Sequence, residues 1–240
     1  MKKAKLLLLV FFFAKSYALE PFKAVYKLSV NGWQVAEEKR QLTKAKDDTY
    51  FYTANANTTG LISILKSYKI NAASKFRFKN DKLDSIFYKR QEFDSDDVAK
   101  DVSIAINSDE QIVKTTKKNK TWNTKKGNVI DDLNLMLAIA NDLKKKPNKK
   151  DFYYQVADGK KIANQHFITH TRDTIKINDS NTEIIKLKKI VKDKDRKIEI
   201  WLAPKFNYIA VKIIQNEPNG DIYEYNLIAL NDAIITILNQ

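Results

Sequence analysis

The chain of 240 residues contains no cysteine, and this absence excludes several classes of protein. No disulfide can staple the fold, no thiolate can bind a metal or act as a nucleophile, and no N-terminal cysteine can hold a lipid anchor. Glycine (5 residues) and proline (4 residues) are scarce, and neither a Gly/Ser linker nor a phosphate-cradling glycine loop is present. A chain of this length can bury a large apolar core without cross-links, so we expect a single domain.

Histidine is also rare, and the two that occur, His166 and His170, do not suggest a metal site. The residues around them alternate as in a strand, where positions four apart lie about 13 Å from each other, too far to ligate one metal. The acids Asp94, Asp96 and Asp97 could ligate calcium, but they lack the glycine and distal glutamate of an EF-hand, so we interpret them as a solvated turn. A Gly-x-Ser-x-Gly motif and a histidine triad are missing too. We therefore predict no metal site, no cofactor and no catalytic residue, and hence no enzyme.

The N-terminus has the pattern of an export signal. Three lysines among the first five residues precede an apolar run over residues 6–13, which is far shorter than the roughly 20 residues that span a bilayer. Signal peptidase requires small side chains at the last and third-last positions, and Ala18 and Ser16 supply them. We predict a cleaved signal peptide over residues 1–18, a mature domain over residues 19–240 and a periplasmic location. An uncleaved N-terminal anchor is the alternative.

Alternation of apolar and polar residues predicts strands through most of the chain. The first two, at residues 22–30 and 33–42, flank Asn31-Gly32, a pair that favours a tight hairpin turn. Further strands are predicted at residues 50–56, 68–78, 83–93, 98–106, 152–156, 162–177, 183–191, 198–202, 208–214 and 222–230.

One segment, residues 131–146, has apolar side chains at spacings of three and four and is predicted to be an amphipathic helix. We expect Asp131 to cap its first turn and Pro147 to end it. A single helix among about a dozen strands is incompatible with parallel βαβ alternation. The sequence therefore predicts a mainly β fold, either a single curved antiparallel sheet or an incomplete β-barrel, with one covering amphipathic helix.

The chain is strongly basic. Its formal net charge is +14, and removal of the four lysines of the predicted signal leaves +10. A basic surface favours anionic lipids, acidic glycans or nucleic acid. The many Lys, Asn and Ile residues are equally typical of an AT-rich genome, so the charge alone does not decide between function and composition. Aromatic residues interleaved with lysine also occur on nucleic-acid-binding sheets, but predicted export argues against that partner.

Several segments together resemble a family of secreted bacterial proteins known as domain-of-unknown-function family 3108. They occur in the family's order over nearly the whole predicted mature chain: residues 26–32, 60–65, 132–133 and 156–162, the Trp-Leu-Ala-Pro block at 201–204, and residues 208–213. The chain departs from the family where Asn134, Lys205 and Ala210 replace a typical serine, acid and proline. The resemblance implies a periplasmic, β-rich protein without established catalytic residues, similar in shape to the curved half-barrels of periplasmic lipoprotein carriers.

These observations lead to one main hypothesis and two alternatives. The main hypothesis is a periplasmic binding or envelope-maintenance protein, a soluble monomer, whose concave sheet holds a lipid, an acyl chain or a hydrophobic segment. The candidate contacts are large apolar residues expected on the concave face or its rim: Trp33, Tyr52, Leu61, Ile64, Phe76, Met136 and Trp201. The first alternative is an interaction protein that docks onto an envelope protein through sheet edges or residues 60–65. The second is a glycan-active enzyme that uses acids such as Asp94, Asp97 or Asp158.

Overall fold

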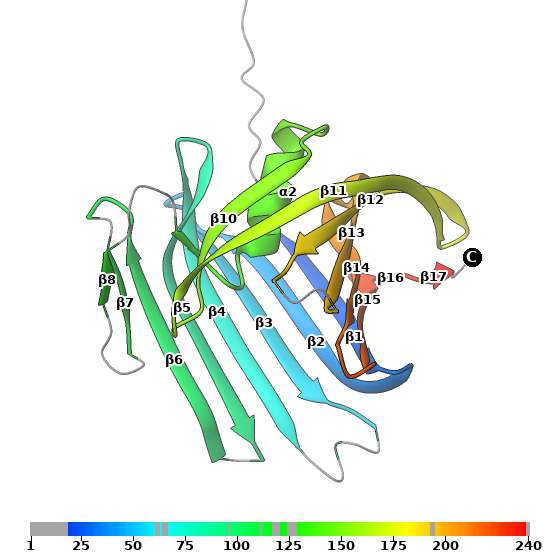
Figure 1. Ribbon diagram of the computed structural model, residues 1–240, viewed down its shortest axis with the longest axis horizontal. Helices are drawn as coiled ribbons and strands as arrows, with labels where there is room; N and C mark the ends of the chain where they lie inside the picture. Colours follow the sequence, from blue (N-terminus) through cyan, green and yellow to red (C-terminus); the bar gives the residue numbers. More distant parts are fainter. Residues whose placement is uncertain are drawn as a thin grey trace, which may run out of the picture.

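The protein is described by a computed structural model, in which residues 19–60, 63, 67–95, 97–110, 112–116, 121–123, 129–192 and 195–238 are placed. The predicted signal peptide lies outside the described residues. Within these residues the chain forms one sheet of 17 strands and a single α-helix of eleven residues (Figure 1). No described helix is long and apolar enough to span a membrane.

The first half of the sheet is an antiparallel meander in which each strand pairs with the next. Its strands are β1 (Phe22–Val30), β2 (Trp33–Lys44), β3 (Tyr50–Thr58), β4 (Tyr68–Lys79), β5 (Lys82–Asp94), β6 (Asp97–Asn107), β7 (Ile112–Thr115) and β8 (Thr121–Asn123). The Asn31-Gly32 hairpin turn is confirmed, and both residues have the positive φ that the sequence predicts.

The second half of the sheet is joined to the first by the pairing of β1 with β15. Its strands are β9 (Val129–Asp131), β10 (Asp151–Ala157), β11 (Ile162–Ile177), β12 (Ser180–Ile190), β13 (Lys197–Ala203), β14 (Ile209–Asn216), β15 (Ile222–Leu230), β16 (Ala233–Ile234) and β17 (Ile237–Leu238). The pairing of β9 with β10 is parallel. Among the described residues β8 pairs with β7 and β9 pairs with β10, and no register joins β8 to β9, so the sheet stays open. The predicted curved antiparallel sheet is confirmed.

The helix α2 (Leu135–Lys145) lies across one end of the concave face (Figure 1). The prediction that it starts at Asp131 was wrong by four residues. Residues 129–131 pair with β10 instead, and the buried Asp131 lies in this strand. Asn134 precedes the first helical residue, and its side chain makes no capping hydrogen bond because it faces a buried polar cluster.

The main core lies between α2 and the sheet, and a smaller cluster packs where β5, β6 and β7 meet β9. Beside the smaller cluster, Gly159 forms the turn between β10 and β11 with φ +83°, and a Cβ at this position would collide with Val102. Both the positive φ and the close approach therefore require glycine.

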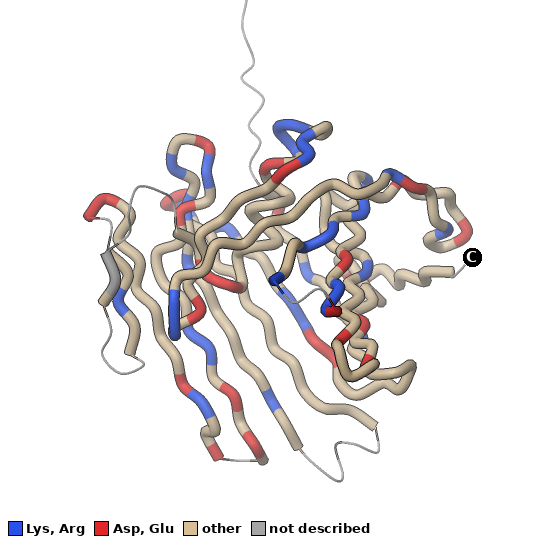
Figure 2. Tube along the Cα trace, viewed as in Figure 1, with Lys and Arg blue, Asp and Glu red and all other residues tan. Residues whose placement is uncertain are grey.

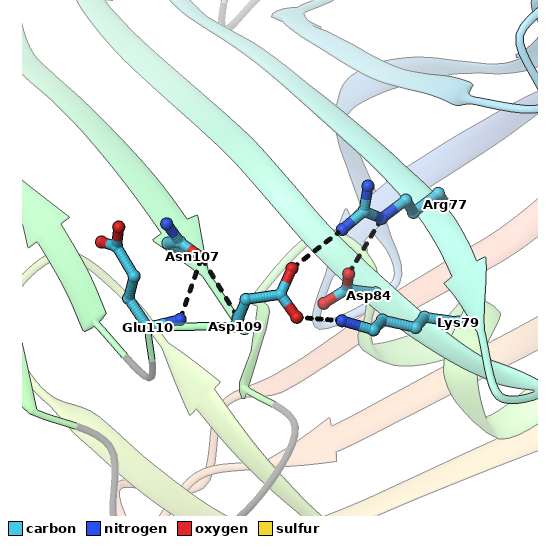
Figure 3. Close-up of polar contacts among 6 residues, drawn as sticks. All are labelled: Arg77, Lys79, Asp84, Asn107, Asp109 and Glu110. Atoms are coloured by element: carbon cyan, nitrogen blue, oxygen red, sulfur yellow. Dashed lines mark hydrogen bonds and ion pairs between the residues drawn. The ribbon is translucent and has the colours of Figure 1, made fainter.

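On the face of β4 opposite to the core, an ionic cluster joins the β4–β5 hairpin to the β6–β7 turn (Figure 3). Arg77 Nε lies 3.2 Å from Asp84 Oδ2, and Arg77 Nη2 lies 3.7 Å from Asp109 Oδ2. Lys79 forms an ion pair with Asp109. The side chain of Asp84 is only 4% exposed, whereas that of Asp109 is 64% exposed. The cluster contains two cations and two acids, so we interpret it as structural.

Replacement Arg77→Met should lower the free energy of unfolding by about 2 kcal/mol, because it leaves the buried Asp84 carboxylate without its cationic partner. Lys79→Met, which removes an exposed ion pair, should cost less than about 1 kcal/mol. Urea unfolding of the two variants gives the comparison. Equal losses would show that general charge balance, rather than the buried carboxylate, determines the effect.

Candidate functional site

The concave face contains an open cavity of about 340 Å³, here named the central cavity, which is lined by β2 to β5 on one wall and by β11 to β15 on the other. Two further cavities adjoin it. The helix-end cavity, of 210 Å³, lies next to α2 and shares Arg40 and Met136 with the central cavity. The mouth cavity, of 220 Å³, shares Tyr88, Arg90 and Asp132 with it. The three spaces therefore lie in sequence along the concave face.

Small side chains create the central cavity. Strand alternation directs Ala54, Ala56 and Ala72 to the concave face, and Ala54 pairs directly with Ala72. Further along the same strands the corresponding positions are aromatic, and Tyr50 stacks on Phe76 with ring centroids 5.1 Å apart. The aromatic rings fill the space near α2, whereas the alanines leave it open.

Two ion pairs flank the alanines. The row Arg40, Ala54, Ala72, Arg90 crosses β2 to β5, and the next row is Glu38, Ala56, Ile70, Glu92. Arg40 forms an ion pair with Glu38, and Arg90 Nε lies 2.9 Å from Glu92 Oε1. The guanidinium of Arg40 also lies over the ring of Tyr26, 5.0 Å from its centroid. Each arginine is thus balanced by an acid two residues away on its own strand.

The opposite wall is mostly apolar. Leu187, Ile200, Ile213 and Tyr225 form one cross-strand row from β12 to β15. The next row lies nearer the C-terminal end of β12 and extends to β11. It consists of Phe167, Lys189, Ile198 and Gln215. Burial lowers the pKa of Lys189. This wall therefore changes from apolar to polar between two neighbouring rows.

A buried polar cluster fixes the segment that connects β9 to α2. Ser74 Oγ donates a hydrogen bond to Asp131 Oδ2 (2.6 Å), and the Asn134 backbone N–H donates to Asp131 Oδ1 (3.0 Å). The Asn134 side-chain amide donates to Ser74 Oγ (2.7 Å), Ser85 Oγ (2.9 Å) and Asp131 Oδ2 (2.7 Å). Because Asp132 and Leu133 lie between these anchors and line the central cavity, the cluster positions part of the cavity wall.

Burial raises the pKa of Asp131 to about 6, although its hydrogen bonds favour the charged form. A carboxyl whose pKa is higher in the folded than in the unfolded state destabilises the fold as the pH rises through that interval, here by about 3 kcal/mol in total. Relative to wild type, Asp131→Asn should therefore gain about 2 kcal/mol of unfolding free energy between about pH 4.5 and about pH 7.5. Urea unfolding at both pH values gives the result. Asp132→Asn controls for loss of one negative charge, and parallel pH profiles for wild type and Asp131→Asn would contradict the expectation.

The structure brings together two of the seven predicted contact residues. Tyr52 and Met136 both line the helix-end cavity, and Met136 also lines the central cavity. Phe76 is fully buried in the core against Tyr50. Leu61 and Ile64 lie outside the described residues.

The two tryptophans among these candidates lie away from the central cavity. Trp33 is 79% exposed at the β1–β2 hairpin. Trp201 is on the face of β13 opposite to Ile200, between the ammonium groups of Lys186 and Lys212, and its Nε1 donates to Glu199 Oε1 (2.6 Å).

The histidines and acids considered in the sequence occupy turns and strands. His166 and His170 lie on β11, as predicted, and the His166 ring stacks on Tyr153 at 4.2 Å. Asp158 Oδ1 accepts hydrogen bonds from the backbone N–H groups of residues 160 and 161, so this carboxylate closes a turn. Asp94 pairs with Asp97 at the β5–β6 turn. Among the described residues no group of three or more potential ligands could hold a metal ion.

Sequence reasoning missed the basic residues of the central cavity, namely Arg40, Arg90 and Lys189. Alternation alone would have directed each of them inward, because each shares a strand face with buried apolar neighbours. Figure 2 shows basic and acidic residues mixed over both halves of the coloured part of the chain rather than gathered on one face. Overall charge was therefore a poor guide to the cavity.

Comparison with known proteins identifies relatives of the sequence and of the fold. Residues 25–227 match the family described as "Protein of unknown function (DUF3108)". The fold is similar to the crystal structure of a β-barrel-like protein of domain of unknown function DUF1849 from Brucella abortus, with a TM-score of 0.60, 11% identity, and coverage of 92% of this chain and 98% of that chain. No curated protein sequence matches this chain significantly.

Proposed function

Since the chain belongs to the DUF3108 family, whose function is unknown, we propose from the geometry of its concave face that it is a binding protein for a lipid, an acyl chain or another hydrophobic segment. The observation that supports this proposal is the alanine-lined central cavity between two walls of the sheet. Ligand sites are commonly concave and largely apolar, with a few polar groups that orient the ligand. The proposed role is binding rather than catalysis.

The location proposed for this activity is the periplasm, after removal of residues 1–18. This part of the proposal depends on the basic, apolar and small-residue pattern of the N-terminus. N-terminal sequencing of the protein purified from a periplasmic extract should begin at Leu19. Recovery of a chain that begins at Met1, in the membrane fraction, would contradict it.

Native mass spectrometry of the purified mature protein tests the binding role. We expect a monomer with an additional mass that disappears after organic extraction, and the extract should contain an amphiphile. If the protein carries no additional mass, and the delipidated protein binds neither fatty acids, phospholipids nor lipopolysaccharide, the proposal fails.

A second candidate function is docking onto an envelope protein, and one surface favours it. Trp33, Val30 and Tyr223 lie in one cross-strand row at the ends of β2, β1 and β15, and Ile222 is adjacent. Trp33, Ile222 and Tyr223 are all exposed. Exposed aromatic residues in a cluster are typical of protein interfaces. Crosslinking in intact envelopes followed by a pull-down should recover a stoichiometric partner with wild type and lose it with Trp33→Ser.

A further inference from the structure

The charges of the central cavity do not balance between its two walls. On the wall formed by β2 to β5, Glu38 compensates Arg40, and Glu92 compensates Arg90. Glu92 also accepts a hydrogen bond from Lys100, at 2.5 Å, so one acid serves two cations. The paired acids on this wall are therefore already occupied by cations of the same wall, and none of them is left over for the opposite wall.

Lys189 is the cation of the opposite wall, and among the described residues no carboxylate oxygen lies within 4.0 Å of its Nζ. The Nζ of Lys189 lies over the ring of Phe167, 5.8 Å from the ring centroid. Asp132 attracts Lys189 and Arg196 repels it, both at longer range. Lys189 is partly buried, and partial burial of an ammonium group without a counter-ion is unfavourable, so a bound anion would stabilise this position.

The position of Lys189 defines a direction in the cavity. It lies one residue before the end of β12, in the row that also contains Ile198 and Gln215. The neighbouring row, further from the strand end, is formed by Leu187, Ile200 and Ile213 and lacks any charged residue. A ligand that complements both rows has an acidic head group at Lys189 and an apolar part against the row of Leu187, Ile200 and Ile213.

The alanines provide the space for that apolar part. Ala54 and Ala72 face the central cavity, and Met136 lies at its boundary with the helix-end cavity. Both neighbouring arginines are already paired, so they need no further anion. An alkyl chain can therefore lie on the alanines while the head group meets Lys189, for which no carboxylate of the described residues lies in ion-pair range.

We propose that the ligand is an amphiphile with an acidic head group, which binds Lys189, and an alkyl chain that lies across Ala54 and Ala72. This inference rests on the proposed binding function and specifies its ligand class. Carboxylate and phosphate head groups share the chemistry required, because both accept charge-assisted hydrogen bonds from an ammonium group.

The test compares three ligands that have the same alkyl chain: dodecanoate, methyl dodecanoate and dodecyl phosphate. Their affinities for the delipidated mature protein are measured by isothermal titration calorimetry and by displacement of the neutral fluorophore N-phenyl-1-naphthylamine. We expect the better acidic ligand to bind at least about tenfold more tightly than the neutral ester, a factor that corresponds to about 1.4 kcal/mol. A tighter phosphate indicates a phospholipid-type head, and a tighter carboxylate indicates a free fatty acid.

Variants then test the assignment to Lys189. Lys189→Met keeps the aliphatic stem against Phe167 and should abolish the preference for acid over ester, whereas Lys189→Arg should retain it. Lys188→Met is the matched control, because Lys188 lies next to Lys189 on the opposite face of β12, and it should also retain the preference. Circular dichroism and urea midpoints establish that each variant is folded.

The outcomes separate this inference from the proposed function. Equal affinity for acid and ester in wild type overturns the acidic-head inference, even without any variant, while leaving a hydrophobic binding site in place. A preference that persists in Lys189→Met overturns the role of Lys189. Failure of all three ligands to bind wild type contradicts the proposed function itself.

Discussion

Replacement of Asn134 by leucine is expected to lower the free energy of unfolding by about 4 kcal/mol. The two N–H groups of the Asn134 side-chain amide are shared among three buried oxygens, on Ser74, Ser85 and Asp131, and leucine has a similar size but no donor. The substitution therefore leaves a buried carboxylate and two hydroxyls with fewer partners, and each such group costs about 1 to 3 kcal/mol. Urea unfolding monitored by circular dichroism measures the loss. For a protein with a typical stability of about 5 to 15 kcal/mol, this loss is a large fraction of the total.

Asn141→Leu is the matched control for this experiment. Asn141 is also buried on α2, but its amide donates a single hydrogen bond, to the Asp81 carbonyl oxygen at 3.2 Å. We expect a loss of about 1 kcal/mol. Asn134→Ser should fall between the two because a hydroxyl restores one donor. If Asn134→Leu and Asn141→Leu cost the same, the cluster around Asp131 has no special role in fixing the segment between β9 and α2.

Ala72→Phe is expected to weaken the binding of a dodecyl-chain ligand by about a hundredfold while leaving the protein folded. The phenyl ring would occupy part of the central cavity and displace the alkyl chain from the alanines. Loss of contact for three or four methylene groups costs about 3 kcal/mol, which corresponds to a factor of about one hundred. Calorimetric titration with dodecanoate and with dodecyl phosphate measures the change.

Ala73→Phe supplies the control, because Ala73 is the next residue of β4 and is exposed on the opposite face. This variant introduces the same ring outside the cavity and should leave the affinity unchanged within about twofold. A folded Ala72→Phe protein with wild-type affinity would place the ligand elsewhere and remove the main support for the proposed function. Binding that is weakened equally by both substitutions would point to a general effect on β4 rather than to occupation of the cavity.

The fold was largely predictable because strands and turns are specified locally. Period-two alternation predicted β1 to β6, and the Asn31-Gly32 pair predicted the first hairpin turn. The strands predicted at residues 198–202 and 208–214 are confirmed as β13 and β14, and a 3₁₀ turn (η2, Pro204–Phe206) joins them. The start of the helix was not predictable in this way. Asp131 has the sequence context of a helix cap, but its pairing with Ala157 of β10 depends on residues far away in the chain.

The candidate site was predicted only in part, since local patterns do not specify which strands face each other. Alternation placed Tyr52 and the alanines of β3 on one face, and helical spacing placed Met136 on the inner face of α2. Alternation did not reveal that the face is packed where Tyr50 stacks on Phe76 and open where the alanines lie, because this difference depends on the pairing of Ala54 with Ala72. Trp33 and Trp201 were chosen for size, yet hairpin position exposes the first, and strand direction turns the second away from the cavity.

By itself, the sequence determined an antiparallel, disulfide-free sheet with one helix, because alternation, turn residues and the absence of cysteine act over short distances along the chain. Only the tertiary structure decided which charges meet. Glu38 and Glu92 pair with the two arginines of one wall, while curvature of the sheet brings Lys189 from the other wall to the same cavity, where no carboxylate of the described residues lies in ion-pair range of it. Compensation of a charge depends on distances between strands that lie far apart in the chain, and those distances are set by the curvature and register of the whole sheet.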